Sequence, residues 1–146
     1  MRRKRMRLKD FDYSSNGAYF VTICAQNRRT VFTNDEKHIL ETELLALRDR
    51  FSGLTIDTYV TMADHVHVIF MFDDCRSSLP EIIQAFKSLS TVSMKQHSAI
   101  SRLWQRGYFD RMVRNDAELE ALREYIRNNP IGAEIKGQGR ASSAPT

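Results

Sequence analysis

Residues 65–72 read His-Val-His-Val-Ile-Phe-Met-Phe, and both faces of this stretch are largely apolar when the chain is extended. A strand with two apolar faces is covered on both sides, so it belongs in the middle of a sheet. Residues 55–62, just before it, alternate between apolar and polar side chains, as a half-buried strand does. The two stretches are close enough in sequence to pair as a hairpin, which predicts a sheet built around residues 65–72.

Two more strands and three helices are predicted around this hairpin. The turn signal Asn16-Gly17 precedes a run of β-forming residues at 18–24, and residues 108–113 form a candidate fourth strand. Apolar side chains at helical spacing, with capping residues before them, predict helices over 34–51, 78–94 and 115–130, the last ended by Pro130. The order of the first six elements matches the α+β, ferredoxin-like (split βαβ) plan, an antiparallel sheet with helices on one face, and a C-terminal helix follows. This plan supports many unrelated activities.

The length of 146 residues fits one domain, and its composition is that of a globular protein. No apolar run reaches the roughly 18–20 residues that a membrane span needs, so we expect no membrane partner. The two cysteines, Cys24 and Cys75, are too few for a disulfide framework. They fit the reducing cytoplasm, which is the predicted location.

The net charge of +4 is unevenly distributed. Six of the 22 basic residues lie among the first nine, and without them 16 basic residues face 18 acidic ones. We therefore expect a basic arm over residues 1–12, a folded domain over 13–132 and a flexible tail over 133–146. A basic arm often contacts nucleic acid, although a solubilising, disordered end has the same composition. The basic residues of the arm that we take as candidate DNA contacts are Arg2, Arg3, Lys4, Arg5 and Arg7.

His65 and His67 stand two apart on the predicted central strand, so their side chains project from the same face. Two imidazoles side by side make half of a metal site or a phosphate-binding surface, whereas polar positions at a strand end are the simpler alternative. Ile69-Phe70 excludes a hydrolase motif that continues with Asp-His, and the spacing of the cysteines excludes a structural zinc site. A third ligand must come from a distant segment.

The last predicted helix offers such a ligand. Tyr125 and Asn129 lie four residues apart, on one side of that helix at the border of its apolar stripe. Asn129 could give an amide oxygen to a hard cation, and Tyr125 could present its phenol to a phosphate held by that cation. Ordinary half-buried packing for Tyr125 and a helix stop for Asn129 are the competing interpretations.

The stretch from residue 87 to residue 114 has six basic residues and a single acid, with aromatic residues among them. Cations that bind phosphates and rings that stack on bases are what single-strand binding needs, although Trp104 also suits a core. Arg28 and Arg29 could extend the contact surface. The candidate DNA-binding residues of the stretch are Lys87, Arg102, Trp104, Arg106, Tyr108, Arg111 and Arg114, and Phe109 adds a third ring.

Four segments together resemble the single-tyrosine HUH transposases, and most of all the REP-associated tyrosine transposases of bacteria. They are 17–22 (GAYFVT), 62–67 (MADHVH), 104–110 (WQRGYFD) and 125–130 (YIRNNP), and the likeness runs from about residue 7 to residue 131. It implies a divalent cation, Mg²⁺ or Mn²⁺, held by His65, His67 and Asn129. It also implies Tyr125 as a nucleophile that leaves a 5′-phosphotyrosine and a free 3′-OH. The family commonly has Pro-Asn where this chain has Ala63-Asp64, so Asp64 is a possible carboxylate beside the metal site.

The main hypothesis is therefore a metal-dependent enzyme that nicks and rejoins single-stranded DNA at hairpin-forming repeats, bound to the bacterial nucleoid while it acts. The alternative is a non-catalytic nucleic-acid-binding or regulatory protein with the same fold. A replication or plasmid-transfer nickase is a third possibility, but we expect a longer chain for it. The resemblance is compatible with a homodimer as well as with a monomer.

Overall fold

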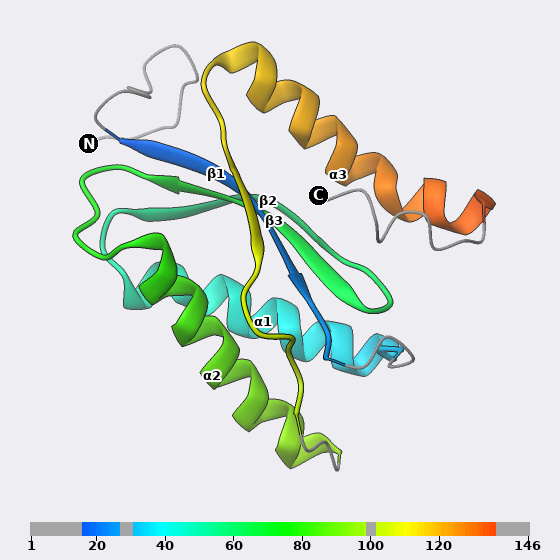
Figure 1. The fold of residues 1–146 in the computed structure, drawn as a ribbon. Helices are drawn as coiled ribbons and strands as arrows, with labels where there is room; N and C mark the ends of the chain where they lie inside the picture. The colour runs from blue at the N-terminus through cyan, green and yellow to red at the C-terminus, as the bar shows by residue number, and fades with distance from the viewer. Residues whose placement is uncertain (1–15, 27–30, 99–101, 137–146) are drawn as a thin grey trace.

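The computed structural model describes residues 16–26, 31–98 and 102–136, with side chains in the last segment described up to Asn129. Its sheet has four antiparallel strands in the spatial order β2-β3-β1-β4 (Figure 1). This order, with β3 inside, is that of the predicted split βαβ plan. The strands are β1 (Gly17–Cys24), β2 (Leu54–Thr61), β3 (His65–Phe72) and β4 (Phe109–Met112).

Three helices cover the sheet: α1 (Asn34–Arg50), α2 (Leu79–His97) and α3 (Asp116–Lys136). Helices α1 and α2 lie on one face, and α3 lies on the other (Figure 1). Capping boxes of Thr33 with Glu36 and of Ser78 with Glu81 begin α1 and α2, in line with the predicted capping residues before these helices. The prediction of helices on one face plus a separate C-terminal helix is confirmed. None of the helices that the structure describes has the length and apolar character needed to cross a bilayer.

The prediction that Pro130 ends the last helix is wrong, because α3 continues to Lys136. Proline has no backbone N–H, so it removes the hydrogen bond to the carbonyl of Ile126, four residues earlier. One missing bond weakens a helix without forcing the chain to leave it. The predicted start is correct, since the Asn115 side chain accepts a hydrogen bond from the Glu118 N–H at 2.8 Å.

Every residue of β3 is buried, as expected for a central strand. Its even-numbered residues, such as Val68 and Phe70, belong to the core under α1 and α2. Its odd-numbered residues, such as Ile69 and Met71, belong to a second core under α3. Because side chains alternate along a strand, His65 and His67 must also face α3.

An ion pair fixes α3 to β2. The Arg123 guanidinium donates to both carboxylate oxygens of Asp57, at 2.6 and 2.8 Å, and the two side chains are only 15% and 10% exposed. Asp57 lies where a bulge shifts the register of β2 between Ile56 and Thr58. Hydrogen bonding to Asp57 raises the pKa of Arg123, so the guanidinium stays charged. This pair sets the position of α3 two residues before Tyr125.

Replacing Arg123 with alanine should lower the free energy of unfolding by about 3 kcal/mol, because it leaves the Asp57 carboxylate buried without its partner. Urea denaturation measures this loss. Arg127→Ala is the matched control on the same helix, since Arg127 is 55% exposed and its ion pair among the described residues is with Glu120 at 3.4 Å. It should cost less than about 0.5 kcal/mol. Equal losses for the two variants would mean that the Asp57 pair has no special weight.

Candidate functional site

The two histidines of β3 lie side by side under α3, as the sequence predicts. His65 is 3% exposed and His67 is completely buried. Their ring centroids are 4.7 Å apart, and the rings are close to perpendicular. Two imidazoles are thus held together on a rigid strand.

Each histidine has one ring nitrogen engaged by a neighbour. The Nδ1 atom of His65 lies 2.8 Å from the Asp64 carboxylate, and the Nδ1 atom of His67 lies 2.8 Å from the Thr22 hydroxyl. The Asp64 carboxylate accepts from Nδ1 of His65, so Nε2 is the ring nitrogen left for a ligand. This is how a metal-binding histidine is commonly oriented. Thr22 is the site residue that the predictions missed.

Several buried polar atoms of the predicted site residues have no hydrogen-bond partner among the described residues. Among the described side chains, five have a buried polar atom without a hydrogen bond, and four of these atoms belong to the predicted site residues: His65 Nε2, His67 Nε2, Tyr125 Oη and Asn129 Nδ2. The fifth belongs to Thr61, which pairs with Val66 on the other face of the sheet. Buried polar atoms almost always find partners in proteins, so these atoms are free to bind a ligand or water.

Tyr125 packs against His67 and against Phe20 of β1. Its ring centroid lies 5.6 Å from that of His67 and 5.9 Å from that of Phe20, and Phe20 stacks on His67 at 5.4 Å. Asn129 follows one turn later on the same side of α3 and is 8% exposed. The C-terminal half of α3 lies at the same end of the sheet as the β2–β3 turn that precedes His65 (Figure 1). One chain therefore brings the two histidines and the tyrosine together, with Asn129 one turn along.

The donor set suits a divalent cation. In the described part of the chain, His, Cys, Asp and Glu form no group of three or more with ligand spacing. The Asn129 amide can supply a further ligand, since a half-turn of the amide exchanges Nδ2 for an oxygen. Burial lowers the pKa of His67 to about 3, and the neighbouring His65 acts in the same direction. His67 is therefore neutral near neutral pH, as a ligand must be.

Acid should destabilise the metal-free protein through His67. The unfolded chain binds a proton at this imidazole below its ordinary pKa of 6.5, whereas the folded chain binds it only near pH 3. The free energy of unfolding therefore falls as the pH falls between these values, by up to about 1.4 kcal/mol per unit. Urea denaturation in EDTA of wild type and His67→Gln measures this, because the variant lacks the titrating group. Parallel pH curves for the two proteins would contradict the prediction.

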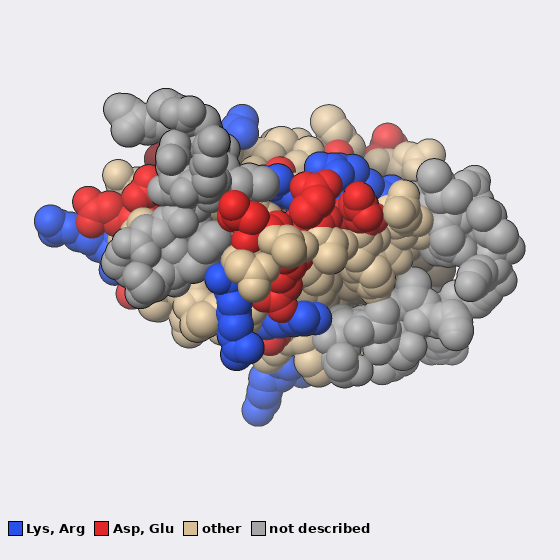
Figure 2. All heavy atoms as spheres, turned by 90° about the horizontal axis from the view of Figure 1, so that it is seen from above, with Lys and Arg blue, Asp and Glu red and all other residues tan. Residues whose placement is uncertain are grey.

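The predicted DNA-binding residues fall into separate sets. The arm residues and Arg28 and Arg29 lie outside the described residues. Four arginines are exposed, and one of them, Arg111, donates to Glu118 of α3 at 2.6 and 3.1 Å. Seen from the α3 side, acidic side chains gather near the centre of the molecule and basic ones lie between and around them (Figure 2). The exposed set is Arg102, Arg106, Arg111 and Arg114.

Two of the predicted contacts have structural roles instead. Trp104 is 5% exposed, packs between Phe32 and Phe86, and donates its indole N–H to the Ser90 hydroxyl at 2.9 Å. Its ring is a core residue and cannot stack on a base. Lys87 donates to the carbonyls of residues 105 and 107, at 2.9 and 2.6 Å, and burial lowers the pKa of its amine. Its ammonium group organises the loop before β4.

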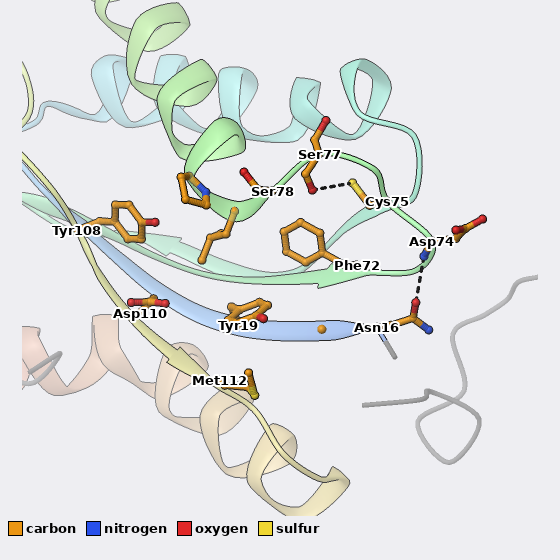
Figure 3. Close-up of a pocket in the computed structure, with 13 residues that line it drawn as sticks. Asn16, Tyr19, Phe72, Asp74, Cys75, Ser77, Ser78, Tyr108, Asp110 and Met112 are labelled. Carbon is orange, nitrogen blue, oxygen red and sulfur yellow. Dashed lines mark hydrogen bonds between the residues drawn. The ribbon is translucent and has the colours of Figure 1, made fainter. Parts of the chain in front are cut away.

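Tyr108 faces away from the histidines. It packs against the core under α1 and α2 and lines a hollow of about 1130 Å³ beside the start of α2 (Figure 3). Tyr19, Phe72 and Met112 line the same hollow, and all lie on that side of the sheet. The structure therefore does not bring Tyr108 to the candidate site.

Comparisons with known proteins agree with the fold. Residues 13–129 match the sequence profile of the family described as "Transposase IS200 like". Two Haemophilus influenzae proteins are similar in sequence. One, called an uncharacterized protein, is 28% identical over 88% of both chains. The other, named "Putative REP-associated tyrosine transposase", is 22% identical over 82% of this chain and 73% of its own. The solved structure of a REP-associated tyrosine transposase bound to a REP hairpin superposes with a TM-score of 0.69 at 18% identity, covering 90% of this chain and 72% of that one.

Proposed function

Because the chain belongs to the IS200-like transposase family, we propose that it cuts and rejoins single-stranded DNA at hairpin-forming repeats, with Tyr125 as the nucleophile. His65, His67 and Asn129 would hold the divalent cation, Mg²⁺ or Mn²⁺. The observation that carries this proposal is the group of four buried, unpartnered polar atoms on these residues. A phosphate and its cation would give each of them a partner.

The ligand atoms that the site would supply are imidazole nitrogens and an amide oxygen, beside the phosphate oxygens of the DNA. The amide oxygen and phosphate oxygens suit both Mn²⁺ and Mg²⁺, whereas imidazole nitrogens are the more usual ligands of Zn²⁺, Cu²⁺, Fe²⁺ and Ni²⁺. Asp64 and Thr22 would fix the rings of His65 and His67 through their Nδ1 atoms, which keeps both Nε2 atoms directed at the site. When bound, the cation would neutralise phosphate charge and favour ionisation of the phenol.

The reaction assigned to Tyr125 forms a bond between its phenolic oxygen and phosphorus and breaks the bond from phosphorus to the 3′-oxygen. The phenol loses its proton to solvent, and the departing oxygen takes one up, giving a 5′-phosphotyrosine and a free 3′-OH. The packing of Tyr125 on Phe20 and His67 supports this role, because it limits the positions that the phenol can reach. The covalent bond keeps the phosphodiester energy, so a 3′-OH can reverse the step.

Hairpin DNA is proposed as the substrate on two grounds. The solved structure with the same fold is bound to a REP hairpin, and this chain has exposed arginines around the α3 face together with a basic N-terminal arm. Because Tyr125 contacts His67 of its own chain, the site would be complete in one copy, and the possible homodimer remains a prediction without a role in the chemistry.

A labelling experiment tests the proposal. The purified chain is incubated with hairpin oligonucleotides that have single-stranded flanks, in Mg²⁺, Mn²⁺ or EDTA, and resolved on a denaturing gel. A 3′-end label should move with the protein, because the enzyme joins the 5′ end of the downstream fragment. A 5′-end label should give a shorter free product that a terminal transferase can extend. DNA binding that EDTA leaves unchanged, with no adduct in either metal, would favour the non-catalytic alternative.

A further inference from the structure

We propose that Phe109, on the edge strand β4, is a stacking platform for an unpaired DNA base close to the phosphate that Tyr125 attacks. The inference deepens the proposed function and rests on it. The ring would bind a base of the single-stranded flank, and it would position that flank across the sheet without taking part in the chemistry.

The register of the sheet places Phe109 in line with the histidines. Thr22 of β1 pairs with His67 on one side and with Phe109 on the other. Side chains of residues paired across neighbouring strands point to the same face of the sheet. The hydrogen bond between Thr22 and His67 shows that this is the face of the histidines. Phe109 is therefore two strand spacings from His67, about 10 Å, on the candidate-site side of the sheet.

The ring of Phe109 is accessible, unlike the other two rings of its stretch. It is 43% exposed, whereas Trp104 is in the core and Tyr108 faces α2. Helix α3 packs chiefly on β2 and β3. Among the described elements, it therefore leaves the β4 edge of this face of the sheet largely uncovered. The ring lies on the same face of the sheet as His67, about 10 Å away, so one DNA strand can reach both.

The surroundings fit single-stranded nucleic acid. Arg111 lies two residues further on the same face of β4, with a side chain that is 62% exposed, and Arg106 is exposed just before the strand. Gly107 follows Arg106 in this loop, with φ of +80° and no atom within 4 Å of where a Cβ would lie. An exposed ring flanked by cations is how proteins bind single strands with little sequence preference.

Phe109→Leu tests the proposal, since leucine stays apolar in the strand but has no ring. The probe is a fluorescein-labelled hairpin with oligo(dT) flanks, titrated in EDTA and followed by anisotropy. Affinity should fall between about 5-fold and 100-fold. Phe109→Trp should bind like wild type and show quenching of the new indole on binding, against a constant signal from the buried Trp104. The same hairpin without flanks should bind both variants and wild type alike.

Met112→Ala is the matched control, because Met112 is on the same short strand, is 49% exposed and faces the other side of the sheet. It should bind the flanked hairpin like wild type. Equal binding by Phe109→Leu and wild type would overturn the stacking role alone, and so would equal losses for Phe109→Leu and Met112→Ala. Failure of the wild type to bind flanked or unflanked hairpins would count instead against the proposed function.

Discussion

Replacing Tyr125 with phenylalanine should abolish the covalent protein–DNA adduct, lowering its yield by more than about 1,000-fold, because the variant lacks the attacking oxygen. The ring itself remains, so its packing on Phe20 and His67 is kept. The adduct is measured with the 3′-end-labelled hairpin on a denaturing gel, and affinity for the same DNA is measured by anisotropy. Only the first quantity should change.

The stability of Tyr125→Phe separates chemistry from structure. The Tyr125 hydroxyl is buried without a hydrogen bond, so its removal should leave the free energy of unfolding unchanged within about 0.5 kcal/mol, or raise it. Tyr59→Phe is the control, because this tyrosine packs against the core under α1 and α2 and should keep full activity. As much adduct from Tyr125→Phe as from wild type would show that another residue is the nucleophile.

Replacing His65 with alanine should lower cleavage by more than about 1,000-fold while most of the DNA affinity remains. The variant loses one of the two Nε2 atoms proposed to hold the cation. Mn²⁺ binding, followed by electron paramagnetic resonance without DNA, should weaken with it. Asp64→Asn keeps the imidazole but removes the carboxylate at its Nδ1, so its metal affinity should fall by a smaller factor, roughly 10-fold to 100-fold.

His38→Ala is the control for this experiment, since His38 is exposed on α1, on the far side of the sheet. It should cleave and bind Mn²⁺ like wild type. The proposed cation site is wrong if His65→Ala cleaves DNA as wild type does. It is also wrong if wild-type cleavage in Mg²⁺ or Mn²⁺ equals that in EDTA.

The sequence predicted the fold well because the apolar pattern of residues 65–72 leaves few choices. A strand that is apolar on both faces must be central, and the capping signals around it place the helices. The end of α3 was mispredicted because a proline in a helix interior costs one hydrogen bond, and a sequence does not show whether the chain accepts that cost.

The candidate site was predictable only where its residues share an element. His65 with His67, and Tyr125 with Asn129, follow from strand and helix spacing. The contact of Thr22 with His67 depends on the register between β1 and β3, which no local pattern encodes. The same limit applies to the aromatic residues at 104, 108 and 109. Composition alone does not show that Trp104 is in the core, that Tyr108 lies on the α2 side of the sheet, or that Phe109 lies on the side of the histidines.

The attachment of α3 by Arg123 and Asp57 has a consequence for mixed populations of the protein. The proposed nucleophile, Tyr125, is carried on a helix bound to the sheet of its own chain, so we expect that an intact tyrosine in one copy does not serve the histidines of another. A mixture of a Tyr125 variant with a His65 variant should therefore not recover cleavage activity. Inactivating mutations would then act independently in each molecule, and activity would follow the number of wholly intact chains.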